Sequence, residues 1–151
     1  MQIIKGRKIV DDHWRHVADD QDIPAGLDVI VTLARWTRDR DQLLQRPGGL
    51  GVRLGPAEPP ELIADDLGHF QVIALDFPAF TDGRAYTHAR KLRERYGYRG
   101  EVRAVGDVLR DQLSYMHRCG FDAMEVRTDR SIENALEAFT EFSVTYQPTV
   151  N

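Results

Sequence analysis

The chain has 151 residues, of which 42% are hydrophobic and 29% charged, so we expect one globular domain over residues 1–151 and not a disordered chain. The net charge of −4 argues against nucleic-acid binding. The single cysteine excludes an internal disulfide and a thiolate metal site. No apolar run approaches about 18 residues, which predicts no signal peptide, no membrane span and a cytoplasmic protein.

The first predicted element is a short N-terminal hairpin. Residues 2–5 and residues 8–10 read as two strands around Gly6, and glycine can supply the turn between them. The polar stretch that follows is expected to be irregular. Residues 1–25 are therefore predicted to be a hairpin with an irregular extension.

Five apolar, β-branched runs follow, at residues 29–33, 50–54, 72–75, 102–105 and 123–126. Each gap has room for one helix and two short loops, and this alternation predicts βα repeats around a parallel sheet over residues 26–146. We therefore expect an α/β fold with about five mostly parallel strands. Two architectures fit equally well, a flavodoxin-like sheet and a partial (β/α) barrel.

Apolar stripes with helical spacing occupy the second half of the chain. Gly97 and Gly120 follow the first two stripes, at positions where a left-handed C-cap ends a helix. Asp107 is well placed to cap the second helix. Helices are predicted over residues 82–96, 107–119 and 131–142.

The loop at residues 76–84 is the richest candidate for chemistry, because ligands of open α/β sheets bind beyond the carboxyl ends of the strands. Asp76 ends a buried strand and needs a partner, for which Arg84 and Arg103 are the candidates. Gly83 would allow the backbone to approach a ligand or to take a left-handed turn. Arg84 in the first turn of a helix suits a carboxylate, sulfate or phosphate. The candidate ligand-binding residues are Asp76, Asp82, Gly83, Arg84, Arg103, Asp107 and Gln112.

Each candidate also has a purely structural interpretation. Asp82 and Asp107 can be helix caps, Asp76 can simply pair with Arg103, and Gln112 can be a surface amide. Cys119 lies on an apolar helix stripe, so we expect a buried, inert thiol.

No cofactor or metal site can be assigned from the sequence. His13 and His16 are three residues apart, but no cluster of cysteines or acids completes a metal-binding set. Nucleotide-binding glycine motifs and a nucleophile elbow are also absent.

The charge is unevenly distributed along the chain. Residues 83–118 contain nine Lys and Arg against four Asp and Glu, a net charge of +5, so the rest of the chain carries −9. This basic segment could attract a small anion or an acidic protein partner, although a solvated helix face is also compatible with the pattern.

Five blocks of sequence carry a resemblance to a known family. They lie at residues 76–84, 89–95, 100–109, 111–112 and 118–122, and read DFPAFTDGR, ARKLRER, GEVRAVGDVL, DQ and RCGFD. These blocks resemble the bacterial domain of unknown function family 934, whose members are commonly labelled as oxidoreductases of sulfite reduction and encoded beside sulfite reductase genes. The resemblance implies a role in that pathway. It supplies no catalytic residues, although the candidate residues match the most characteristic blocks of the family.

Three functions remain open at this point, and whether the chain is an enzyme is undecided. The first, which we favour, is an accessory protein of assimilatory sulfite reduction that binds an anion, or sulfite reductase or its electron donor. The second is a small enzyme acting on a sulfur oxyanion or sulfonucleotide, with Arg84 and Arg103 holding the anion and an aspartate as acid or base. The third is a structural homodimer whose interface is chiefly the block at residues 76–121, because aromatic Phe77, Phe80 and Tyr86 lie beside Arg84 there.

Overall fold

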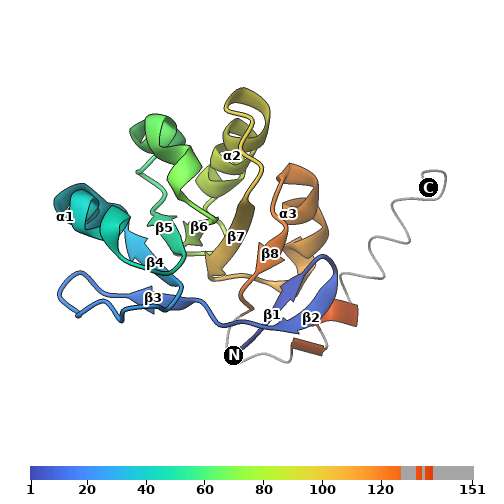
Figure 1. Cartoon of the computed structure of the whole chain (residues 1–151). Helices are drawn as coiled ribbons and strands as arrows, with labels where there is room; N and C mark the ends of the chain where they lie inside the picture. The colour runs from blue at the N-terminus through green and yellow to red at the C-terminus, as the bar shows by residue number, and fades with distance from the viewer. Residues whose placement is uncertain (127–131, 134, 138–151) are drawn as a thin grey trace.

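The computed structural model describes residues 1–126, 132–133 and 135–137 of the chain. Within these residues, eight strands form one curled sheet in the order β2-β1-β8-β7-β6-β5-β4-β3 (Figure 1). The strands are β1 (Gln2–Lys5), β2 (Lys8–Asp11), β3 (Arg15–Val17), β4 (Val29–Thr32), β5 (Leu50–Leu54), β6 (Val72–Phe77), β7 (Glu101–Gly106) and β8 (Ala123–Met124). The helices are α1 (Leu33–Gln45), the 3-10 helix η1 (Pro60–His69), α2 (Arg84–Arg90), the π-helical turn η2 (Lys91–Arg95), the 3-10 turn η3 (Arg110–Gln112) and α3 (Leu113–Cys119).

The strands from β3 to β8 are parallel and follow one another in chain order across the sheet. The helices lie along one face of this sheet (Figure 1). A flavodoxin-like sheet reverses its strand order once, so that alternative is wrong and the partial (β/α) barrel is the observed architecture. The predicted number of five strands is too low, since β3 falls in the stretch expected to be irregular and the hairpin joins the sheet.

The N-terminal hairpin of β1 and β2 is confirmed. These strands pair antiparallel, and β1 continues the sheet by pairing antiparallel with β8. Gly6 and Arg7 both have positive φ, at 59° and 63°, as a tight turn between two strands requires.

The central strands are buried on both faces, which explains their continuous apolar runs. Alternate residues of β5, β6 and β7, such as Val52, Ile73 and Val102, face the helices and belong to the main core. The intervening residues point to the opposite face, called the inner face below. A smaller cluster occupies the inner face and consists of Ile30, Val72, Ala74 and Val105, with Trp14 packed against it.

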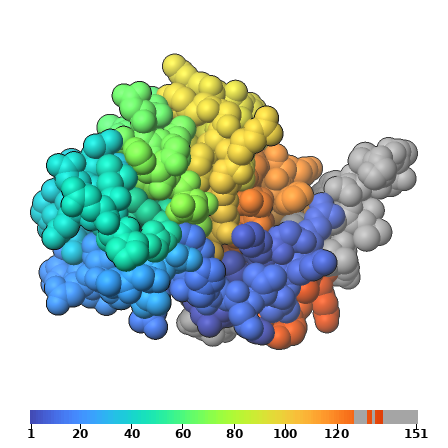
Figure 2. Space-filling model, viewed as in Figure 1, coloured from blue at the N-terminus to red at the C-terminus, as the bar shows by residue number. Residues whose placement is uncertain are grey.

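The chain between β2 and β3 crosses from one edge of the sheet to the other on the side away from the helices (Figure 1). We call residues 12–14 the strap. The N–H of Asp12 donates to the carbonyl of Met1 at 2.7 Å, and the N–H of Arg15, just after the strap, donates to the carbonyl of Asp28 at 3.1 Å. In Figure 2 the N-terminal residues, drawn in blue, accordingly cover the lower side of the molecule.

The predicted helices form with altered limits. The first comprises α2 and η2 and ends at Gly97, whose φ of 63° confirms the C-cap. The second begins only at residue 110, so Asp107 is not its cap, and Gly120 ends it with φ of 115°. The third predicted helix, over residues 131–142, lies largely outside the described residues. The residues described there, 132–133 and 135–137, are helical.

Cys119 is buried, as expected. No helix in the described parts of the chain has the length and apolar character to cross a membrane.

Candidate functional site

The loops that follow β6 and β7 are held together at the carboxyl end of the sheet. The carboxylate of Asp107 accepts a hydrogen bond from the N–H of Phe80 at 2.9 Å, and the amide Nε2 of Gln112 donates to the carbonyl of Phe80 at 3.0 Å. The N–H of Asp107 donates to the carbonyl of Phe77 at 2.7 Å. These two loops, residues 78–83 and 107–112, are called the rim below.

A glycine allows this close approach of the two loops. Gly106 has φ of +95°, and a Cβ at this position would lie 2.5 Å from the carbonyl oxygen of Phe77 and 2.7 Å from Oδ1 of Asp76. Gly83, the glycine singled out from the sequence, has φ of −92°. A Cβ there would meet nothing within 4 Å, so neither a left-handed turn nor a close protein contact demands a glycine at residue 83.

Asp76 pairs with a residue that the sequence interpretation missed. Its Oδ1 lies 2.8 Å from a guanidinium nitrogen of Arg53, and the side chains are 25% and 34% exposed. Neither Arg84 nor Arg103, the two expected partners, makes this pair. Arg53 is the one charged residue in the apolar strand β5, and its side chain points to the inner face beside that of Asp76. A lone charge within a buried run was the signal that could have identified it.

Asp82 and Arg84 form an exposed ion pair beside the rim. Their carboxylate and guanidinium groups are 2.7 Å apart, and the same carboxylate accepts the N–H of Arg84 at 3.1 Å. These hydrogen bonds from Arg84 lower the pKa of Asp82 to about 2. Asp82 is thus ionised at neutral pH, which does not suit the role of a general acid.

Arg103 lies on the inner face, apart from the rim. Its side chain is 1% exposed and hydrogen-bonds to three carboxylates on the inner face. The nearest nitrogen–oxygen distances are 2.8 Å to Asp12, 2.7 Å to Glu101 and 2.8 Å to Glu125. An arginine saturated in this way is not available to hold a small anion.

Two further basic side chains border this buried cluster. Lys5 lies 2.9 Å from Glu101, and His16 lies 2.8 Å from Glu125. Burial alone would raise the pKa of Glu125, but its hydrogen bonds and attraction to His16 and Arg103 outweigh burial and hold that pKa below its ordinary value. The cluster joins the strap and β3 to β7 and to the chain just after β8. We therefore interpret it as a structural clamp.

The family model of a bacterial protein of unknown function, DUF934, matches residues 51–151, which is about two thirds of the chain. The chain belongs to the DUF934 family. No curated protein matches it. The matched region contains the whole rim, the Arg53–Asp76 pair and Arg103, whereas the strap precedes it.

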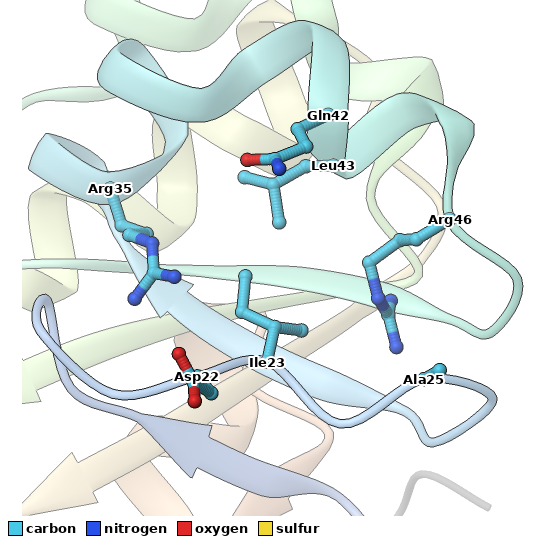
Figure 3. Close-up of a pocket in the computed structure, with 7 residues that line it drawn as sticks. All are labelled: Asp22, Ile23, Ala25, Arg35, Gln42, Leu43 and Arg46. Atoms are coloured by element: carbon cyan, nitrogen blue, oxygen red, sulfur yellow. The ribbon is translucent and has the colours of Figure 1, made fainter.

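A pocket of about 470 Å³ lies between α1 and the chain that connects β3 to β4, away from the rim of this DUF934 protein (Figure 3). Figure 3 shows Arg35 and Arg46 at its two ends, with Ile23 and Leu43 between them. Arg35 donates to the carbonyls of Ala18, Asp19 and Gln21, and Arg46 to those of Pro24, Leu27 and Gly49. Both arginines thus hold the connecting loop in place, and none of the candidate residues lines this pocket.

In the part of the DUF934 protein that the structure describes, the two histidines singled out from the sequence lie beside carboxylates. No group of three or more His, Cys, Asp or Glu side chains there could hold a metal ion. His13 instead lies 2.6 Å from the carboxylate of Asp28, and His16 pairs with Glu125.

The rim offers hydrogen-bonded loops, an exposed aromatic ring and paired charges, a combination that suits the binding of another molecule.

Proposed function

We propose that this DUF934 protein is a non-catalytic accessory protein of assimilatory sulfite reduction that binds a protein partner at the rim. The main support is Phe80, whose side chain is 49% exposed. Its N–H and its carbonyl are both held, by Asp107 and Gln112 respectively. An aromatic side chain on a fixed loop loses little conformational entropy when a partner covers it, which favours binding.

The pathway rests on the resemblance of the sequence to a family whose genes accompany sulfite reductase. Sulfite reductase itself, or the protein that supplies its electrons, is therefore the partner we propose. We place the interaction in the cytoplasm, a reducing compartment that suits a chain with one free, buried cysteine.

An enzyme acting on a sulfur oxyanion or a sulfonucleotide is the second candidate. Its anion site was expected at Arg84 and Arg103, but both guanidinium groups already bind carboxylates and Arg103 is almost fully buried. One observation still favours the enzyme. The Arg53–Asp76 pair is partly exposed at the carboxyl end of the inner face, where a small anion could reach it. An oxidoreductase built there would need a cofactor or reductant from another protein.

Growth of a deletion strain tests the pathway. The strain would be grown on sulfate, sulfite, sulfide or cysteine as the sulfur source, with and without a plasmid copy of the wild-type gene. We expect growth on sulfide and cysteine but poor growth on sulfate and sulfite, restored by the plasmid. Normal growth of the deletion strain on all four sources would remove the protein from sulfite reduction.

Calorimetric titration with sulfite separates the two candidates. The accessory role predicts no saturable heat for the purified protein. Saturable binding to the wild type that is lost in Arg53→Gln would favour the enzyme instead.

A further inference from the structure

Two aromatic side chains are exposed on the rim and on the helix that follows it. Phe80 is 49% exposed and Tyr115, in α3, is 42% exposed. Tyr115 lies one helical turn after Gln112, the residue that holds the carbonyl of Phe80. The other large hydrophobic side chains that are exposed in the described residues are aliphatic, namely Met1, Leu27, Leu44 and Leu62.

A row of aromatic rings connects Tyr115 to the core. Its ring packs edge-on against Tyr86 with centroids 4.8 Å apart, and Tyr86 packs against Phe77 of the core at 5.1 Å. α2 and α3, which carry Tyr86 and Tyr115, lie next to each other on the helical face of the sheet (Figure 1). The exposed ring of Tyr115 is therefore fixed on a rigid base.

Arginines flank these rings. The guanidinium carbon of Arg118 lies 5.6 Å from the centroid of the Tyr115 ring. Exposed Arg90 lies one helical turn after Tyr86, whose ring packs against that of Tyr115. Arg84, at the end of the loop that carries Phe80, is already paired with Asp82. Exposed aromatic rings beside arginines are the composition most enriched in the energetic centres of protein interfaces.

We propose that Phe80, Tyr115 and the flanking Arg90 and Arg118 form a docking surface for an acidic segment of another protein. Carboxylates of that segment would bind the guanidinium groups, and one apolar side chain would cover the two rings. This inference rests on the proposed function, because it assigns the chemistry of the partner that binds at the rim.

The charge distribution selects an acidic partner. The helical segments on this side of the sheet, residues 84–95 and 110–119, contain seven Lys and Arg against two Asp and Glu, a net charge of +5 in a protein whose total charge is −4. A partner rich in Asp and Glu would be steered towards this side of the molecule. A two-fold dimer would instead place the same patch against itself and bring the arginines of both copies together, which is unfavourable.

A peptide titration of the full-length protein, followed by NMR, tests the surface without reference to the pathway. The probe is a synthetic peptide of alternating Glu and Leu, and its counterpart has Lys in place of Glu. We expect saturable shifts at the backbone amides of Phe80 and Tyr115 with the acidic peptide only, weakened by added salt. Binding by the Lys peptide with equal affinity, or no shift at millimolar acidic peptide, would overturn the proposal.

Charge-reversal variants locate the binding. Arg90→Glu with Arg118→Glu should weaken the peptide about tenfold or more, whereas Lys8→Glu with Arg99→Glu makes the same charge change away from the rim and should weaken it much less. Tyr115→Ala, which leaves the charges intact, should also weaken binding.

Equal effects of the two double variants would overturn the proposed docking surface. Concentration-dependent shifts at the rim without peptide would indicate self-association and would overturn it too. Because this titration is independent of growth, peptide binding at the rim alongside normal growth of the deletion strain would reject the pathway and keep the surface.

Discussion

Arg103 is the side chain whose loss should affect stability most. Replacing it by Met leaves the carboxylates of Asp12, Glu101 and Glu125 buried together without their shared cation. We expect Arg103→Met to lower the free energy of unfolding by about 3–5 kcal/mol at neutral pH, measured by urea denaturation. Arg53→Met, which breaks a partly exposed pair, should cost about 1 kcal/mol or less. An Arg103→Met protein as stable as the wild type would contradict the role of the cluster as a clamp.

Glu125 should make the protein sensitive to acid. Its pKa is lower in the folded protein than the ordinary value of 4.5, so the unfolded chain takes up a proton first as the pH falls. The stability contributed by this group is therefore complete above about pH 4.5 and is lost as the pH falls through the folded pKa. In Glu125→Gln, the free energy of unfolding should fall less steeply below about pH 4.5, as followed by denaturation at several pH values. The same slope in both proteins would show that this carboxylate is not linked to folding.

The meeting of the loops after β6 and β7 depends on Gly106 and not on Gly83. A methyl group at Gly106 would collide with the carbonyl of Phe77 in a left-handed conformation that disfavours side chains. Gly106→Ala should therefore lower the unfolding free energy by about 1–3 kcal/mol, and Gly83→Ala should change it by less than about 0.5 kcal/mol. Thermal or urea unfolding of the two variants gives the comparison. Equal losses would mean that the close approach of the loops is not what requires a glycine.

The elements that the sequence predicted best are those with a local cause. Strands β4 to β7 are covered on both faces and so appear as continuous apolar runs, and the glycines at 97 and 120 end their helices locally. β3 was missed because Arg15 and His16 are exposed and leave Val17 as its only buried residue. Asp107 was expected to cap a helix, but it instead holds Phe80, which is 27 residues away in sequence. Such long-range hydrogen bonds leave no local pattern.

The curled sheet as a whole is completed by contacts between distant parts of the chain. The strap brings Asp12 to Arg103, 91 residues away, and β3 brings His16 to Glu125, 109 residues away. Strand periodicity could not choose between an open sheet and a partial barrel, because both have the same βα rhythm. Arg103 lies between the apolar residues Val102 and Ala104, but we expected it to pair with Asp76 or hold an anion, because its carboxylate partners lie too far away in sequence to be foreseen.

The βα rhythm predicted that the candidate residues follow neighbouring strands. The structure has Asp82, Asp107 and Gln112 after β6 and β7, whereas Asp76 is still within β6. Their roles could not be predicted, because the partners that hold them, Arg53 and Phe80 among others, follow from the register of neighbouring strands and from the conformation of the loops.

Complementation by two double variants tests most directly whether the protein acts by binding a partner at the rim or by chemistry at the Arg53–Asp76 pair. Phe80→Ala with Tyr115→Ala removes the exposed rings, and Arg53→Gln with Asp76→Asn removes the charges of the partly exposed pair. Both proteins would first be shown to fold by their unfolding midpoints, and then expressed in the deletion strain growing on sulfite. We predict that the variant without the rings fails to restore growth and that the variant without the paired charges restores it. The reverse result would contradict the account, because it would make Arg53 and Asp76 the functional groups and the rings dispensable.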